Sequence, residues 1–214
     1  MMNKRYFITG IGTEVGKTVV SAALVDYFGT DYWKPIQSGD LQASDSMRIR
    51  ALCSSAPTIF PERYQLKHPA SPHDASEREG IQISLTDFSL PNQTVALLVE
   101  GAGGLFVPIN SEEFMIDLMD QLGLPAILVC RDYLGCINHT LLSIAALVNK
   151  GIQLAFVVFN GAFEPATQRV IESYLPAGTG AIYIPEIKEI NKRNLSTAVR
   201  QIKIVEHTNG AFRK

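Results

Sequence analysis

The chain has 214 residues, 46% hydrophobic and 19% charged, so it can bury a full core and is expected to form one domain over residues 1–214. Nineteen Lys and Arg against 21 Asp and Glu leave a net charge of −2, which argues against the broad positive field of a nucleic-acid-binding protein. Three cysteines without a CxxC pair argue against a disulfide framework or a structural zinc site. No apolar run approaches the ~18 residues of a membrane span, so we expect a cytoplasmic protein acting on small molecules, without nucleic-acid or membrane partners.

A glycine-rich loop follows the first apolar segment. Residues 6–10 are expected to form a strand, and the sequence GIGTEVGKT at residues 10–18 leads into a helix over residues 17–28 that ends at Gly29. Glycines allow the backbone N–H groups of such a loop to surround phosphate, while the helix adds the positive end of its dipole. Lys17 would reach the outer phosphates and the Thr18 hydroxyl would hold Mg²⁺. The spacing departs from GxxxxGK because Ile11 stands at the first glycine position, so this is a variant P-loop.

The rest of the chain alternates short apolar runs with helical patterns. Strands are predicted at residues 31–34, 94–99, 126–130, 154–159 and 181–184, and helices at residues 43–52, 74–78, 114–122, about 134–150 and 165–174. A loop is expected at residues 36–40 and an irregular, proline-rich passage at residues 57–72. The tail from residue 188 is interpreted as a solvated helix and a frayed terminus. This alternation predicts an α/β fold with a doubly wound, mainly parallel sheet flanked by helices.

Three oxygen-bearing side chains are expected to meet at a metal ion. Thr18 follows the loop lysine, Asp45 opens the helix after the second strand, and Glu100 ends an apolar strand, where an unpaired carboxylate would be costly. Mg²⁺ prefers such hard oxygen ligands together with water and phosphate. Lys34 lies at the carboxyl end of a strand, the edge at which ligands bind in open α/β sheets.

Five segments, taken in order, resemble one family. They are GIGTEVGKT at 10–18, KPIQSG at 34–39, SPH at 71–73, VEGAGG at 99–104 and LGCINH at 134–139. Together they are similar to the dethiobiotin synthetases of the P-loop NTPase superfamily, over roughly residues 5–185. The resemblance implies closure of a cyclic urea on 7,8-diaminononanoate with CO₂ or bicarbonate as the carbon source, ATP as co-substrate and Mg²⁺ as cofactor. One amine captures CO₂ as a carbamate, the carbamate takes the γ-phosphoryl group of ATP, and the second amine attacks the mixed anhydride.

The resemblance also implies the roles of individual residues. Catalytic positions would be Thr13, Glu14, Lys17 and Lys34, and metal ligands Thr18, Asp45 and Glu100. Nucleotide would be bound by Gly12, Thr13, Glu14, Val15, Gly16, Lys17, Thr18, Val19, Glu100, Gly103, Asn160, Pro185, Glu186 and Ile187. Substrate would be bound by Lys34, Ser38, Gly101, Gly135, Cys136, Ile137 and Asn138.

The helix that opens at residues 135–138 would bind the substrate carboxylate of the neighbouring subunit, because a helix N-terminus attracts anions. A homodimer with shared active sites would follow. Cys136 by itself is interpreted as a small packing residue, since no activating base adjoins it in the sequence.

The sequence differs from the family at some positions and leaves two alternative functions open. Arg131, Asp132 and Gly161 differ from the residues usual in the family and could alter base contacts. One rival is a regulatory ATPase of the chromosome-partitioning or septum-positioning type, although such proteins carry a second lysine where Gly12 stands here. The other rival is a kinase or amide-forming ligase with the same nucleotide cradle and another acceptor.

Overall fold

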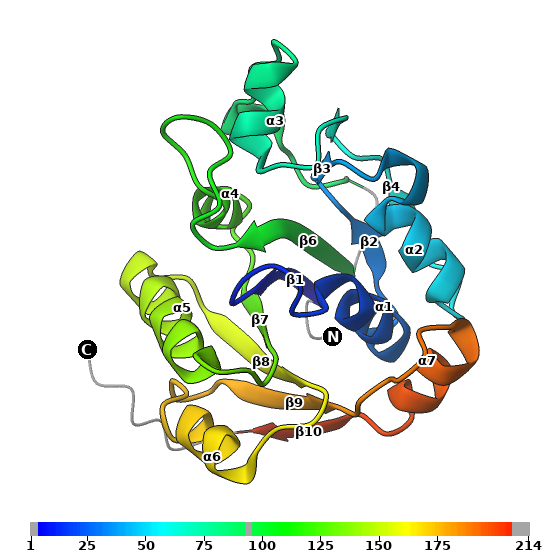
Figure 1. Ribbon diagram of the computed structural model, residues 1–214, viewed down its shortest axis with the longest axis vertical. Helices are drawn as coiled ribbons and strands as arrows, with labels where there is room; N and C mark the ends of the chain where they lie inside the picture. Colours follow the sequence, from blue (N-terminus) through cyan, green and yellow to red (C-terminus); the bar gives the residue numbers. More distant parts are fainter. Residues whose placement is uncertain (1–3, 93–95, 207–214) are drawn as a thin grey trace.

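The computed structural model describes residues 4–92 and 96–206 and is built on an eight-stranded sheet (Figure 1). The strand order is β10-β9-β8-β7-β1-β6-β2-β4. The strands are β1 (Arg5–Gly10), β2 (Asp31–Trp33), β4 (Ile59–Phe60), β6 (Leu97–Gly104), β7 (Ala126–Cys130), β8 (Leu154–Asn160), β9 (Gly180–Ile184) and β10 (Lys203–Glu206). Neighbours run parallel except for β10, which is antiparallel to β9. The predicted mainly parallel sheet is therefore confirmed.

Helices cover both faces of this sheet, as parallel neighbours require. The helices are α1 (Lys17–Phe28), α2 (Asp45–Leu52), α3 (Pro72–Arg78), α4 (Met115–Gln121), α5 (Cys136–Lys150), α6 (Pro165–Ser173) and α7 (Lys192–Val199). Single 3₁₀ turns lie at Leu41–Ala43 and Leu85–Asp87. In Figure 1, α1, α2 and α7 lie on one side of the sheet and α4, α5 and α6 on the other. The predicted flanking helices are thus confirmed.

The central strand β1 shows why the apolar runs are continuous rather than alternating. Tyr6 and Ile8 pack into the core under α1, while Phe7 packs into the core on the opposite face. All three side chains are buried. A strand covered on both faces needs apolar residues at every position, and this places the loop after β1 at the middle of the sheet's carboxyl edge.

A second, two-stranded sheet stands beside the main one. β3 (Ile36–Ser38) pairs in parallel with β5 (Tyr64–Leu66), with Ser38 opposite Leu66. The predictions of a loop at residues 36–40 and of an irregular passage were wrong here. Each strand has three residues, and its partner lies almost 30 residues away, so no local periodicity marks the pairing.

Two further boundaries differ from the prediction. β6 continues through Glu100 to Gly104, so Glu100 lies inside the strand, opposite Ile8, rather than at its end. β10 occupies part of the predicted solvated tail; its mostly exposed residues carry no apolar pattern, and its pairing with β9 is what makes it a strand. Residues 94 and 95 of the predicted third strand lie outside the described residues.

Candidate active site

The glycine-rich loop lies between β1 and α1, at the carboxyl edge of the sheet. Gly16 precedes α1 with a φ of 85°, and a Cβ atom there would collide with the side-chain amide of Asn160. Glu14, at the tip of the loop, also has a left-handed backbone, with a φ of 60°. Lys17 is buried, and its Nζ donates to the Gly12 carbonyl at 2.8 Å. The loop therefore folds back over its own lysine, as a phosphate cradle requires.

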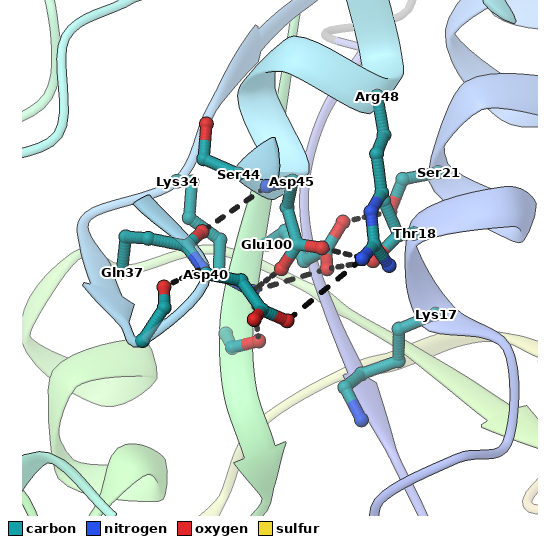
Figure 2. Close-up of polar contacts among 12 residues, drawn as sticks. Lys17, Thr18, Ser21, Lys34, Gln37, Asp40, Ser44, Asp45, Arg48 and Glu100 are labelled. Carbon is teal, nitrogen blue, oxygen red and sulfur yellow. Dashed lines mark hydrogen bonds and ion pairs between the residues drawn. The ribbon is translucent and has the colours of Figure 1, made fainter. Parts of the chain in front are cut away.

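The three predicted metal ligands meet at the start of α1. Thr18 Oγ1 lies 2.8 Å from Asp45 Oδ1 and 3.1 Å from Glu100 Oε1 (Figure 2). They come from α1, α2 and β6, so only the tertiary fold brings them together. This set is called the acid–hydroxyl cluster below.

Lys34 completes this cluster with a cation. Its Nζ lies 2.6 Å from Asp45 Oδ2 and 3.2 Å from Glu100 Oε1, and it also donates to the Gly101 carbonyl at 3.4 Å. The Lys34 residue is 5% exposed and Glu100 is 1% exposed. An ammonium group held between two carboxylates at such depth remains charged and fixed in position.

Three supporting residues were not identified from the sequence. Glu100 Oε2 accepts hydrogen bonds from Ser21 Oγ at 2.6 Å and from the Tyr32 hydroxyl at 3.0 Å, and Gln37 Oε1 accepts from the Asp45 backbone N–H at 3.2 Å. Two of them do have a sequence signal. Ser21 lies one helical turn after Thr18, and Tyr32 lies two residues before Lys34 in an extended segment, so each shares a face with a predicted site residue.

The electrostatics of the site follow from burial and these pairs. Burial lowers the pKa of Lys17 to about 8, aided by the charge of Lys34 and opposed by Glu100 and Asp45. Burial would also lower the pKa of Lys34, but the charges and hydrogen bonds of Glu100 and Asp45 outweigh it, and the pKa is raised. Burial raises the pKa of Asp45, whereas Lys34, the Thr18 hydroxyl and Arg48 together bring it below its usual value. The two lysines of the site thus differ: the pKa of Lys34 is raised and it stays charged, whereas the pKa of Lys17 is lowered to about 8.

A cavity of about 780 Å³ opens beside this cluster. Its wall includes Thr13, Glu14, Gly16, Lys17, Thr18, Val19, Lys34, Ser38, Asp45, Glu100 and Gly103, all of them predicted site residues. Ser38 Oγ is buried and has no hydrogen-bond partner among the described residues. Residues 69–72, which follow β5 and include the first residue of α3, also line the cavity. A buried hydroxyl without a partner on the wall of a polar cavity is suited to a ligand.

Four of the residues expected to bind the nucleotide, Asn160 and residues 185–187, lie on the far side of the loop. Asn160 ends β8, and its Nδ2 donates to the Val15 carbonyl at 2.9 Å. Pro185, Glu186 and Ile187 follow β9 and line a separate hollow of about 360 Å³ next to α7. The structure therefore joins Asn160 to the loop but does not bring residues 185–187 into the main cavity.

The unusual charges at the ends of β7 and β8 have partners. Arg131 lies 3.2 Å from the Glu186 carboxylate, and Asp132 Oδ2 accepts from the Glu164 backbone N–H at 2.7 Å. These contacts tie together the segments that follow β7, β8 and β9, and therefore stiffen the edge next to Asn160.

The start of α5 also lies outside the main cavity. Gly135, with a φ of 106°, precedes the helix, Cys136 is buried at its first position, and Ile137 and Asn138 follow. A hollow of about 330 Å³ separates the glycine-rich loop from this helix and is lined by Gly12, Thr13, Phe106, His139 and Leu142, among others. Thr13 lines both hollows, so residues 135–138 lie across the loop from Lys34 and Ser38.

The chain is similar to several known proteins. The family model described as "AAA domain" matches residues 4–194. The chain is 48% identical to the ATP-dependent dethiobiotin synthetase BioD of Christiangramia forsetii, over 80% of this chain and 83% of that protein. It is 45% identical to the enzyme of the same name from Paramagnetospirillum magneticum, over 78% and 82% of the two chains. Among solved structures, it resembles a chain of the MinC:MinD cell division protein complex from Aquifex aeolicus, with 14% identity, 92% coverage of each chain and a TM-score of 0.51, which shows a shared fold alone.

Proposed function

The chain belongs to the dethiobiotin synthetase family, and we infer that it uses ATP to close the ureido ring of dethiobiotin on 7,8-diaminononanoate and CO₂. The observation that carries this inference is the single cavity lined by Lys17, Lys34 and the unpartnered Ser38 hydroxyl. To form a phosphorylated carbamate, an enzyme needs a loop that binds the phosphates of ATP, a fixed cation beside the reacting oxygens and a polar group that binds the substrate. The first reaction forms a carbamate and releases a proton. Transfer of the γ-phosphoryl group then gives ADP and a mixed anhydride, and the second amine displaces phosphate from it.

The chain's own residues have separate tasks in this scheme. The loop amides and Lys17 hold the phosphates of ATP. Lys34 stabilises negative charge on the carbamate oxygen and on the transferred phosphoryl group. Ser38 donates its hydroxyl to the carbamate or to the diamine. Phosphoryl transfer depends mainly on positioning and on neutralising charge, which is what these buried and fixed groups can supply.

The acid–hydroxyl cluster is suited to Mg²⁺. Its donors are two carboxylates and one hydroxyl that already lie within hydrogen-bond distance of one another, and Mg²⁺ takes hard oxygen ligands of this kind. Thr18, Asp45 and Glu100 would hold the ion, and Ser21 and Tyr32 would orient Glu100. Bound Mg²⁺ neutralises charge on phosphate oxygens. Lys34, paired with both carboxylates, lies beside this metal site and on the wall of the same cavity.

We propose that the protein acts as a homodimer in the cytoplasm. Phe106 and Leu142 line a hollow together with His139, and the Tyr133 hydroxyl hydrogen-bonds to His139. Phe106, Tyr133, Leu142 and the neighbouring Leu134 are exposed and largely apolar. Leu134, fully exposed, directly precedes Gly135. If a second copy covers these side chains, its α5 N-terminus would supply Gly135, Cys136, Ile137 and Asn138 to the substrate carboxylate. Within the described residues no helix is both long and apolar enough to cross a bilayer.

Phosphate release is the test of this function. ATP, Mg²⁺, bicarbonate and 7,8-diaminononanoate are supplied together and then omitted one at a time, and labelled carbon is followed into an acid-stable cyclic urea. Turnover is expected to need all four components. Phosphate release that ignores the diamine and bicarbonate would instead favour the regulatory ATPase, and phosphorylation of an acceptor without bicarbonate would favour the kinase.

A further inference from the structure

Arg48 is a cation at the cavity that the proposed chemistry does not use. It lies on α2, three residues after Asp45, so both side chains leave the same face of the helix. Its side chain lines the cavity together with Lys17 and Thr18, and it points from α2 toward the acid–hydroxyl cluster (Figure 2). Burial raises the pKa of Asp45, and the charge of Arg48 helps to lower it, after the larger lowering effects of Lys34 and of the Thr18 hydroxyl.

The ion pair that Arg48 forms is weak enough to be exchanged. Its guanidinium lies 3.8 Å from Asp40 Oδ2, and the two side chains are 53% and 72% exposed. Such a pair contributes at most about 1 kcal/mol in water. Lys17 and Lys34, by contrast, are buried and engaged with the Gly12 carbonyl and with two carboxylates, respectively.

The charge on the cavity wall favours a role for Arg48 as a phosphate-binding cation. The charged side chains on its wall are the acids Glu14, Asp40, Asp45 and Glu100 and the bases Lys17, Lys34 and Arg48. With Mg²⁺ bound as proposed, the four carboxylates balance the charges of the ion and of the two lysines, one of which is already shared between Asp45 and Glu100. Arg48 therefore supplies the positive charge that is left to attract a polyphosphate. Guanidinium is also the cation best shaped to bind two phosphate oxygens at once.

We propose that Arg48 binds the terminal phosphoryl group of ATP, exchanging the carboxylate of Asp40 for phosphate oxygens when nucleotide enters. The loop amides and Lys17 hold the nucleotide from the β1 side, whereas Arg48 reaches it from the α2 side, next to Asp45. Lys17, which reaches the outer phosphates, faces the same cavity as Arg48, so the γ-phosphoryl group is the part of ATP within reach of α2. This inference rests on the proposed nucleotide site.

The test compares two nucleotides on four variants of the full chain. Binding of a non-hydrolysable ATP analogue and of ADP, each with Mg²⁺, is measured by calorimetry on wild type, Arg48→Ala, Arg48→Lys, Asp40→Asn and the control Arg50→Ala. Arg50 is exposed on the same helix but is not on the cavity wall, so it removes the same charge without the contact. Arg48→Ala is expected to weaken the analogue about tenfold or more and ADP less than about twofold. Arg48→Lys should recover part of the loss, and Asp40→Asn should not weaken the analogue.

Other outcomes distinguish failure of the role of Arg48 from failure of the nucleotide site. Equal losses for ATP analogue and ADP in Arg48→Ala, or the same loss in Arg50→Ala, would overturn the role of Arg48 and leave the nucleotide site standing. Failure of the wild-type protein to bind either nucleotide would overturn the nucleotide site and the role of Arg48 together. Because Arg48 is exposed, its replacement should leave the thermal unfolding midpoint unchanged, and Arg48→Lys repeats the test with the charge retained.

Discussion

Lys34 is a buried lysine that is paired with two carboxylates. Its ammonium group lies between Asp45 and Glu100, and the residue is not part of the phosphate-binding loop. We expect Lys34→Met to lower kcat by about 10²–10³-fold, the loss typical of removing one group that stabilises developing charge. Nucleotide affinity should change less than about threefold, because the lysine acts at the reacting end.

The matched comparison is Lys17→Met, measured in the same steady-state and nucleotide-binding assays. Lys17 lies in the loop and should lose nucleotide affinity as well as turnover. Equal losses of affinity and turnover in Lys34→Met would contradict the separation of roles between the two lysines.

Lys17 leads to a prediction about pH. Its pKa in the free protein is lowered to about 8, first by burial and then by the charge of Lys34. Only the protonated ammonium group attracts phosphate, so affinity for a non-hydrolysable ATP analogue should be constant near pH 7 and fall as the pH rises through about 8. Titration calorimetry between about pH 6.5 and 9.5 measures this.

Lys17→Arg is the control for that experiment, because guanidinium does not deprotonate in this range. The variant should show no decline in affinity near pH 8. A decline of the same size in Lys17→Arg would assign the titration to another group.

At the scale of elements, the small sheet of β3 and β5 places Ser38 on the cavity wall. Gly39 follows β3 with a φ of 71°, and a Cβ atom there would lie 2.6 Å from Pro69 Cα. Gly39→Ala should therefore destabilise the protein by about 2–4 kcal/mol, from the left-handed backbone and the steric clash together. It should also raise KM for the diamine, because Ser38 would shift.

Gly123→Ala is the control that separates these two causes. Gly123 has a similar φ of 63°, but a Cβ atom there would meet nothing within 4 Å. Urea unfolding should give a loss of about 1 kcal/mol and an unchanged KM. Similar losses in both variants would show that contact with Pro69 is not what holds β3 in place.

Elements differ in how far local pattern predicts them. α1, β7 and α5 are close to prediction because each contains its own signal: a continuous apolar run or helical periodicity ended by a glycine in the left-handed region, such as Gly29 or Gly151. β3, β5 and β10 are short or exposed, and each is stabilised as a strand by a partner elsewhere in the chain. No pattern within such a segment reports that partner.

At the scale of the whole molecule, the shared active site is the main prediction. Mixing Lys17→Ala chains with Asn138→Ala chains should produce mixed dimers in which one of two sites has an intact loop and an intact α5. At random assembly, about a quarter of wild-type activity should return. Activity is measured after the two inactive proteins are unfolded and refolded together.

The control pair is Lys17→Ala with Lys34→Ala. Both residues line the same cavity of one chain, so every site in the mixture would lack one of them and no activity should return. If mixed dimers are confirmed by mass and the first pair also stays inactive, the sites are not shared.

The sequence by itself determined the phosphate loop, the order of the main strands and helices, and the family, because each depends on neighbours along the chain; β3, β5 and β10 are outside that set. It also identified Thr18, Asp45 and Glu100 as candidates that should meet, since the carboxyl ends of parallel strands share one edge. Only the tertiary structure placed Lys34 between two carboxylates, positioned Ser21, Tyr32 and Gln37 around them, and brought Arg48 to the cavity. These contacts join residues up to 79 positions apart, and the distances between such residues are set by how the helices pack across the sheet.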